Sequence, residues 1–361
     1  MATANEKLRD AVISHAFQFE RLRAGLDRSA LAWINTELRP ALTAMMGKRL
    51  VAIEERGRDI GKRSTERLKR MQAEIDALIS GNFSELREMM ATQLQEIGGL
   101  EAAWLMDAMD KAGNLPALGI SMTAPSQATI RQVVRGETIR GGFLRDWFKG
   151  IDRSTRLQVK SAIDVGIVSG QSTDEIVRGI IGTRRAAYAD GLLQRSRREV
   201  TTMVRTAATH VSARARQETM EANGDVLKGW QFVATLDTKT TVDCIDADGT
   251  LIPLGETGPT PPLHFNCRSS LAPWLKSWKE MGINLSEAPE GTRESLDGQV
   301  PESKTAKQWL KEQSKERQIE SLGKTKAKWF RNGELTISQM TDASGRELTA
   351  TALAKKYGLK F

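Results

Sequence analysis

The residues best suited to chemistry in this sequence are two cysteines and a histidine that fall close together along the chain. Cys244 is followed by His264 and Cys267, which are three residues apart just after the Pro261-Pro262 pair. Thiolate and imidazole are ligands that zinc prefers, and this spacing in a tight turn lets both groups face one ion. The sequence therefore predicts a metal site of Cys244, His264 and Cys267, with one structural zinc ion as the expected cofactor.

A closed zinc site takes four ligands, and the sequence offers no further cysteine or histidine at a suitable spacing to be the fourth. Among the nearest oxygen donors, Asp237 and Asp243 are the expected candidates for the fourth position. His210 is the weakest ligand candidate, because a lone histidine beside an apolar stripe more commonly packs than binds metal. Two alternatives stay open: the cysteines are reduced and buried as small hydrophobic residues, or they form a disulfide late.

The sequence lacks the familiar catalytic motifs. It has no phosphate-binding loop of the Walker type, no glycine-rich dinucleotide fingerprint after a strand and no nucleophile elbow. A metal-dependent nuclease is the enzyme alternative, because His264 and Asn266 beside Asp237 and Asp243 could hold a hydrolytic ion. Such a site would also need a placed base, and none is evident. The protein is therefore not expected to be an enzyme.

The stretch that must position these residues runs from Trp230 to Trp274 and is rich in turns. Asp248-Gly249 between alternating apolar residues predicts a β-hairpin that brings Cys244 across to the other two ligands. A stretch this small cannot bury a core of its own. We therefore expect it to need a metal or a cross-link to hold its shape.

Most of the remaining chain has the apolar periodicity of amphipathic helices. Pro40 predicts a helix restart near residues 38–39, and Ser80-Gly81 predicts a turn before a helix capped by Asn82. Aromatic residues make up only 5% of the chain, which favours helices over a β-sandwich. The expected fold class is mainly α: an elongated helical bundle with a small β-hairpin-rich Cys/His module and a helical C-terminal tail.

Three further helix boundaries have clear signals. Ser172 and Glu175 have the spacing of a capping box at a helix start. Ser196 is the predicted N-cap of a helix that runs to Ala222, and Gly323 predicts a stop in the C-terminal part. The N-terminus carries charge where a signal peptide needs an apolar core, and no apolar run is long enough to span a bilayer. We therefore expect the protein to be cytoplasmic when made.

The net charge of +8 is concentrated in two basic clusters. Residues 195–217 contain six arginines and one glutamate, and residues 303–331 contain nine lysines or arginines and three glutamates. Cation density of this kind suits DNA phosphates or an acidic protein surface, although a solvated helix face is the alternative. The predicted DNA-binding or partner-binding residues are Arg195, Arg197, Arg198, Arg214, Arg216, Lys324, Lys326, Lys328 and Arg331.

The stretch around the cysteines also carries a longer pattern, in which a tryptophan, an aspartate and a T-T-x-x-C run precede D-G and then P-P-L-H-F-N-C-R-S. This pattern resembles the signature of the phage Mu F-like head morphogenesis family, the minor head proteins of tailed bacteriophages. Many members have cysteine where this chain has Thr241. The residues that carry the resemblance are Trp230, Asp237, Thr240, Thr241, Cys244, Asp248, Gly249, Pro261, Pro262, His264, Asn266, Cys267, Arg268 and Ser269.

The resemblance implies a minor head (capsid) protein of a tailed phage or prophage. Such a protein associates with the portal vertex inside the head and supports head assembly and DNA packaging, retention or ejection. The implied partners are the portal protein, the major capsid or scaffolding protein and packaged double-stranded DNA, with no membrane. The implied location is the virion, in the capsid interior near the portal, with the host cytoplasm during assembly. A DNA-binding protein or a metal-dependent nuclease acting on packaged DNA is the alternative function.

On this basis the chain divides into consecutive regions. They are an N-terminal helical arm (1–112), a helical head-morphogenesis core (125–225), a small β/turn Cys-His module (226–278), a linker (279–302) and a basic helical C-terminal region (303–361). In the last region Trp329 and Phe330 either face a partner or pack against the body of the protein, and packing is favoured.

Overall fold

A computed structural model describes residues 4–54, 62–113, 115–277, 279–282, 292–301 and 303–361. The chain forms two compact units, each assembled from segments far apart in sequence. We call residues 1–21, 96–133 and 208–361 the sheet unit, and residues 22–95 and 134–207 the helical unit. The units therefore cut across the consecutive regions expected from the sequence. Three long helices contribute residues to both units: α1 (Ala4–Trp33), α3 (Lys62–Gly113) and α7 (Leu193–Glu221).

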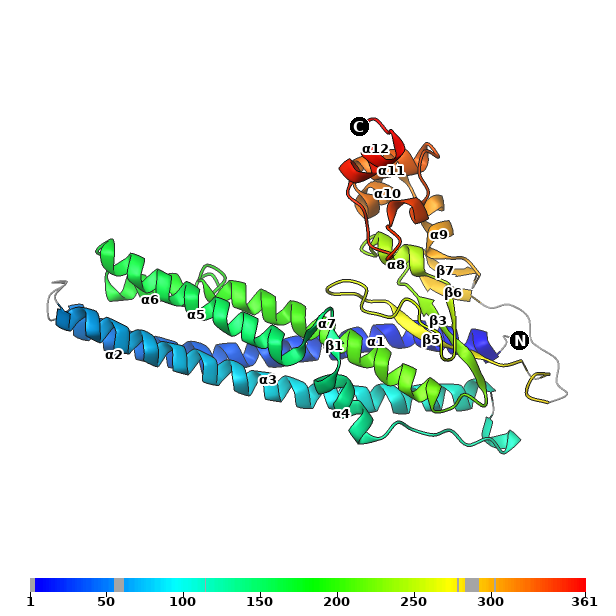
Figure 1. Ribbon diagram of the computed structural model, residues 1–361, viewed down its shortest axis with the longest axis horizontal. Helices are drawn as coiled ribbons and strands as arrows, with labels where there is room; N and C mark the ends of the chain where they lie inside the picture. The colour runs from blue at the N-terminus through cyan, green and yellow to red at the C-terminus, as the bar shows by residue number, and fades with distance from the viewer. Residues whose placement is uncertain (1–3, 55–61, 114, 278, 283–291, 302) are drawn as a thin grey trace. The chain divides into compact units, whose positions relative to one another are not determined.

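The helical unit is built from amphipathic helices (Figure 1). Buried positions of α5 recur every three or four residues, as Leu144, Phe148, Ile151, Thr155 and Val159 show, because that spacing keeps one face of a helix inward. The unit also contains, besides its parts of α1, α3 and α7, the turn η1 (Ile34–Leu38), α2 (Arg39–Glu54), part of α4 (Gln127–Gly136), β1 (Thr138–Ile139), β2 (Gly142–Phe143), α5 (Leu144–Val168) and α6 (Thr173–Ile181).

Polar side chains join α3 to α5 within the helical unit. Ser80 Oγ donates to Asp152 Oδ1 at 3.1 Å, and Gln72 Nε2 donates to Asp164 Oδ1 at 2.6 Å. Because each bond joins a residue of α3 to a residue of α5, the two bonds help to set the position of one helix along the other. The mainly α fold class is confirmed.

Of the two breaks predicted in the N-terminal region, one is confirmed. A π-helical turn, η1, interrupts the helix just before Pro40, and α2 begins at Arg39. The predicted turn at Ser80-Gly81 is wrong, because α3 continues through it and Asn82 Nδ2 donates to Leu78 O inside the helix at 3.0 Å. A glycine within a helix costs only about 1 kcal/mol, which burial of the apolar face outweighs.

Other predicted helix boundaries fare differently. Ser172 and Glu175 form the predicted capping box at the start of α6, and Gly323, with φ of 75°, separates two helices as predicted. The predicted cap at Ser196 is wrong. Helix α7 already begins at Leu193, and the Ser196 hydroxyl instead lies 2.7 Å from Thr155 Oγ1 of α5.

The sheet unit is centred on a three-stranded antiparallel sheet in the order β4-β3-β5. Figure 1 labels two of these strands, β3 and β5. Its strands are β3 (Leu227–Val233), β4 (Leu251–Pro253) and β5 (Ser270–Leu275). Gly229 is required where β3 pairs with β4, because a Cβ atom there would lie 2.0 Å from the carbonyl oxygen of Ile252. Trp230 and Phe232 of β3 are fully buried and pack with Leu105 and Met109 of α3.

A second core lies in the C-terminal part of the sheet unit, where Trp329 is buried and Phe330 packs partly buried against it, as favoured from the sequence. Trp309 is buried in the same core. Within the predicted linker 279–302, residues 292–301 form a β-hairpin, and residues 283–291 and 302 are outside the described part. The elements here are β6 (Thr292–Ser295), β7 (Gly298–Pro301), α9 (Ala306–Glu312), α10 (Lys315–Leu322), α11 (Lys324–Arg331), η3 (Ile337–Met340) and α12 (Ala350–Tyr357), and η2 (Leu115–Leu118) follows α3. Within the described residues, no helix combines the length and the apolar character that crossing a membrane requires.

Candidate functional site

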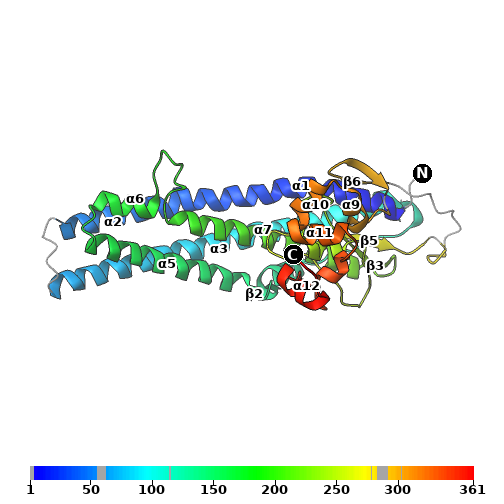
Figure 2. The same cartoon turned by 90° about the horizontal axis from the view of Figure 1, so that it is seen from above.

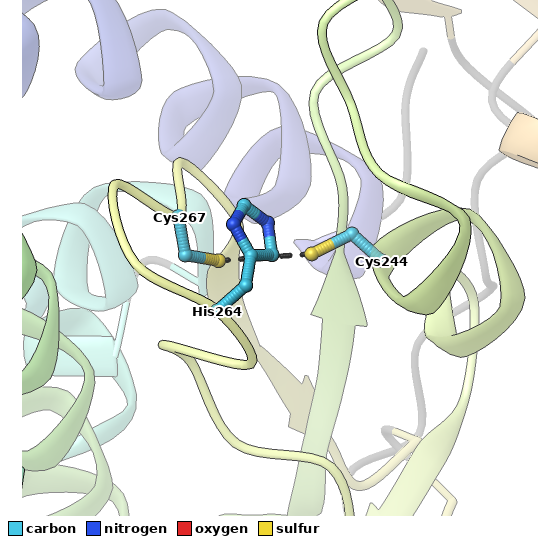
Figure 3. A group of neighbouring side chains, drawn as sticks. All are labelled: Cys244, His264 and Cys267. Carbon is cyan, nitrogen blue, oxygen red and sulfur yellow. Dashed lines mark hydrogen bonds between the residues drawn. The ribbon is translucent and has the colours of Figure 1, made fainter. Parts of the chain in front are cut away.

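The structure brings Cys244, His264 and Cys267 together in the sheet unit (Figure 3). Cys244 lies on the short helix α8 (Val242–Ala247), and the other two lie in the turn that leads into β5. The ligand atoms of the three side chains all lie within 4.8 Å of one another. Both cysteines are reduced and buried, and His264 is half-buried.

The hairpin predicted at Asp248-Gly249 is wrong in form. Residues 242–247 make the helix α8 instead of a strand, and Asp248-Gly249 is the turn that connects this helix to β4. Gly249 still takes a positive φ, of 83°, which this turn requires. Strands β3 and β4, which precede and follow α8 in the chain, pair with each other and so anchor both ends of this helical segment. Cys244 on α8 therefore has a fixed position near His264 and Cys267.

The separation of the two sulfur atoms fits a metal site. Cys244 Sγ and Cys267 Sγ lie 3.7 Å apart. With Zn–S bonds of about 2.3 Å and tetrahedral angles, two thiolates on one zinc ion lie about 3.8 Å apart. A disulfide would need about 2.05 Å, so the structure holds the thiols unbonded. The residues present fit three of the four positions of a tetrahedral zinc ion.

His264 is held in the orientation that a ligand needs. Its Nδ1 lies 2.8 Å from the carbonyl oxygen of Phe265 and donates to it, since a carbonyl only accepts. The lone pair is then on Nε2, and a backbone carbonyl that orients a histidine in this way is the usual support for a metal ligand. Burial opposes protonation, but Cys267, the Phe265 carbonyl and Asp243 together raise the pKa of His264.

Cys267 is fixed by three separate contacts. Asn266 before it has φ of 59°, a conformation that asparagine tolerates better than most residues, and Cys267 N donates to His264 O at 3.3 Å. Thr209 Oγ1 of α7 donates to the Cys267 carbonyl at 2.8 Å. Hydrogen bonding from Cys244, with the nearby His264, lowers the pKa of Cys267 well below the usual thiol value, and the same pairing raises the pKa of Cys244.

Neither aspartate predicted as the fourth ligand joins the group. Both carboxylate oxygens of Asp237 accept from Arg268, at 2.6 and 2.8 Å; although burial opposes ionisation, Arg268 lowers the pKa of Asp237. Asp243 is close enough to His264 for their charges to interact, and burial raises its pKa. Asp243 Oδ1 and Thr241 Oγ1 are both buried and have no hydrogen-bond partner in the described part of the chain. The prediction that Asp237 or Asp243 is the fourth ligand stays a prediction.

The structure does not support the expectation that the Cys/His module needs a metal to hold its shape. The two cysteines pack into the core that contains Trp230, and Val242 and Ile245 of α8 pack into the core that contains Trp329. The module therefore lies between two larger cores. A bound metal would add to this support and not substitute for it.

A buried ion pair beside the module was not foreseen. Asp248 accepts from Arg293 Nη1 at 3.0 Å, from the backbone N–H of Ala234 at 2.7 Å and from that of Ala306 at 2.8 Å. One carboxylate thus ties together the end of β3, the hairpin β6–β7 and the start of α9. The motif contained Asp248, but nothing in the sequence distinguishes a buried ion-paired aspartate from a turn residue.

The arginines predicted on α7 have unequal surroundings. The prediction that Arg216 binds DNA or a partner is wrong. This residue is 1% exposed, and its guanidinium donates to Glu101 Oε2 at 2.7 and 2.9 Å. Arg214 pairs with Glu218 at 2.9 Å, and Arg195 pairs with Glu199 at the same distance. Arg198 is exposed and Arg197 is half-buried.

The predicted C-terminal cations divide in the same way. The prediction that Lys326 binds DNA or a partner is wrong, because its side chain is 10% exposed and its Nζ lies 2.5 Å from Glu347 Oε1. Lys324, Lys328 and Arg331 of α11 are exposed. His210 is buried in α7 and is not part of the Cys/His group.

Comparison with known proteins gives one match. Residues 157–272 match the family model described as Phage Mu protein F like protein, which confirms the resemblance inferred from the sequence. The matched region begins within α5, runs through α6, α7, β3, α8 and β4, and ends within β5, so it includes all three residues of the Cys/His group. No curated protein and no solved structure matches the chain.

Proposed function

We propose that this chain is a minor head protein of a tailed phage or prophage, because residues 157–272 match the phage Mu F-like family model. The observation that carries the proposal is that the matched region contains the complete Cys/His group. The match ends just after the turn that holds His264 and Cys267, and Thr209 of α7 is bonded to that turn. The family description speaks for head morphogenesis, and no catalytic constellation among the described residues competes with a structural role.

In this role the protein associates with the portal protein in the capsid interior and contacts the major capsid or scaffolding protein during assembly in the host cytoplasm. It supports head assembly and the packaging, retention or ejection of DNA. Long amphipathic helices such as α3 and α5 suit it, since helices with one apolar and one polar face commonly bind partners by packing.

The test is to locate the protein in finished particles. Virions purified from cells that express a tagged chain should contain it by mass spectrometry, and the tag should capture portal protein from a lysate of assembling heads. Absence from particles together with failure to capture portal protein would remove the proposal. A matched control is the exposed variant Arg131→Gln, which should enter particles like the wild type.

A structural zinc ion is part of this proposal. Cys244, His264 and Cys267 would hold it, and it would supply a further link between α8 and the turn before β5. The fourth position of such an ion is open to water or to an added protein ligand. Elemental analysis of the purified protein should find about one zinc per chain.

DNA binding is the second candidate, favoured by the exposed cations Arg198, Lys324, Lys328 and Arg331. Contacts to phosphates release counterions, so the affinity for duplex DNA should fall steeply between low and moderate salt. Affinity that does not change with salt would exclude it. A nuclease is less well supported, because Arg268 already occupies both carboxylate oxygens of Asp237.

A further inference from the structure

Two arginines of the helical unit lie close together without a negative partner. Arg39 begins α2, and Arg197 lies in the first turns of α7. Both side chains are half-buried. In the described part of the chain no carboxylate pairs with either of them, and Arg197 Nε is buried without any hydrogen-bond partner. Burial and the positive charge of Arg39 lower the pKa of Arg197.

Such an arrangement is costly unless something neutralises it. Two guanidinium groups in a partly desolvated setting repel each other. Arg39 Nη2 donates to the carbonyl oxygen of Asn35 at 3.2 Å, whereas Arg197 Nε loses its hydration and has no partner among the described residues. Two arginines that are buried elsewhere in this protein, Arg216 and Arg293, each have a carboxylate partner. The uncompensated pair therefore indicates that the neutralising group comes from another molecule.

The loop between α6 and α7 completes the arrangement. Figure 2 shows this connection standing out from the helices. Tyr188 in the loop lies against Arg39, whose guanidinium carbon is 3.5 Å from the centre of the ring. Tyr188 and Ala187 both have positive φ, of 63° and 47°, a strained conformation that costs on the order of 1–3 kcal/mol per residue. Strain of this kind persists only where the surrounding structure holds the loop in place.

The base of the loop holds it in this way. Gly182 and Gly191 touch so closely that a Cβ on Gly191 would lie 2.2 Å from the Gly182 nitrogen. Asp190 accepts from the backbone N–H and from the hydroxyl of Thr183, both at 2.7 Å. Arg184 and Arg185 are exposed near the tip. The loop therefore places the Tyr188 ring on Arg39 and carries two further cations beside it.

We propose that Arg39, Arg197 and Tyr188 form a docking site for an acidic side chain of a partner protein, with Arg184 and Arg185 at its rim. Arginine and tyrosine in a half-buried, rigid setting are the residues that dominate protein–protein contacts. A guanidinium pair fits one carboxylate through charge-assisted hydrogen bonds. The proposal rests on the proposed function in one respect: it assumes that the chain assembles with other proteins.

A protein partner suits the site better than nucleic acid. Contacts to a DNA backbone use a continuous track of exposed cations. Here the carboxylates of Glu37, Asp190 and Glu199 interrupt the cations of the same segments, so the cations form no continuous track for a rigid duplex. A flexible acidic segment of a protein needs no such track, because one of its carboxylates can reach the two half-buried arginines by itself.

The experiment compares two probes on the purified full-length chain. Binding of a fluorescent oligoglutamate peptide and of a short duplex DNA is measured by anisotropy for the wild type and for the double variant Arg39→Gln/Arg197→Gln. We expect the double variant to bind the peptide about tenfold or more weakly, because truncating one side of a desolvated charge pair costs at least that much. Arg131→Gln, which removes an exposed arginine of the sheet unit, should bind both probes like the wild type.

Charge reversal tests the site without relying on a loss. Arg197→Glu should weaken oligoglutamate binding and create binding of an oligolysine peptide that the wild type lacks, and circular dichroism verifies that each variant is folded. Unchanged peptide binding in the double variant would overturn the proposal. So would a loss of DNA binding without a loss of peptide binding. These assays need no virion, so the site is tested separately from membership of the phage head.

Discussion

At the scale of single residues, each of the three members of the Cys/His group also has a support outside the group. His264 is oriented by its own turn, Cys267 by Thr209 of α7, and Cys244 by α8. Because these supports are independent of any ion, removal of one ligand should cost the metal and leave the fold. We predict that Cys267→Ser abolishes binding of zinc while the circular dichroism spectrum stays helical.

The measurement is elemental analysis of protein purified with limiting zinc, beside a thermal melt with and without a chelator. Wild-type protein should gain stability from free zinc, by about 2.7 kcal/mol at a concentration one hundred times the Kd, because only the folded state has the site. The Cys267→Ser variant should gain none. Equal zinc content in the two proteins would leave the cysteines as packing residues only.

A second residue-scale prediction concerns the missing fourth ligand. Thr241 caps α8 three residues before Cys244, and its hydroxyl is buried without a hydrogen-bond partner in the described residues. We predict that Thr241→Cys tightens zinc binding about tenfold or more, since it offers a third thiolate to an incomplete set. Competition with a zinc-responsive dye measures this, and Thr250→Cys, at an exposed position, is the matched control. A similar gain in both variants would contradict it.

At the scale of elements, Asp248 and Arg293 couple β3, β6 and α9 through one buried pair. Removing one partner of a buried ion pair typically costs about 3–5 kcal/mol. We therefore predict that Asp248→Asn lowers the free energy of unfolding by about that amount, measured by urea denaturation. Asp107→Asn breaks the exposed pair with Lys111, with side chains 56% and 76% exposed, and should cost under about 1 kcal/mol. Equal effects would show that the buried pair has no special role.

At the scale of the whole molecule, a polar network joins segments that are distant in the chain. Glu101 of α3 is buried between Arg216, His15 and Ser212, with its oxygens 2.6 Å from His15 Nε2 and 2.7 Å from Ser212 Oγ. Burial alone would raise the pKa of Glu101, but Arg216, His15 and Ser212 outweigh it and lower the pKa to about 2. Trp104 stacks on His15 at 3.8 Å and covers this network.

This lowered pKa predicts acid sensitivity. The unfolded glutamate titrates at 4.5, so the stabilisation is fully present above pH 4.5 and is lost as pH falls toward 2. We predict a loss of about 3 kcal/mol from this group across that interval. Urea unfolding at several pH values should show a shallower dependence on pH for Glu101→Gln, which is also less stable at neutral pH. An unchanged slope in the variant would contradict the assignment.

The sequence by itself determined the features that depend on near neighbours. The mainly α fold, the capping box at Ser172, the helix stop at Gly323 and the pattern around Cys244, His264 and Cys267 follow from local spacing and side-chain chemistry. The last of these identified the phage Mu F-like region that comparison confirms.

Only the tertiary structure decided which polar groups are buried and what neutralises them. Arg216 and Lys326, predicted to bind DNA or a partner, instead form ion pairs with Glu101 and Glu347. A continuous helix runs through Ser80-Gly81, where a turn was predicted. The partners of these residues come from other segments of the chain, and the free energy of burying a charge depends on those partners. A pattern that reads only adjacent residues contains no information about them.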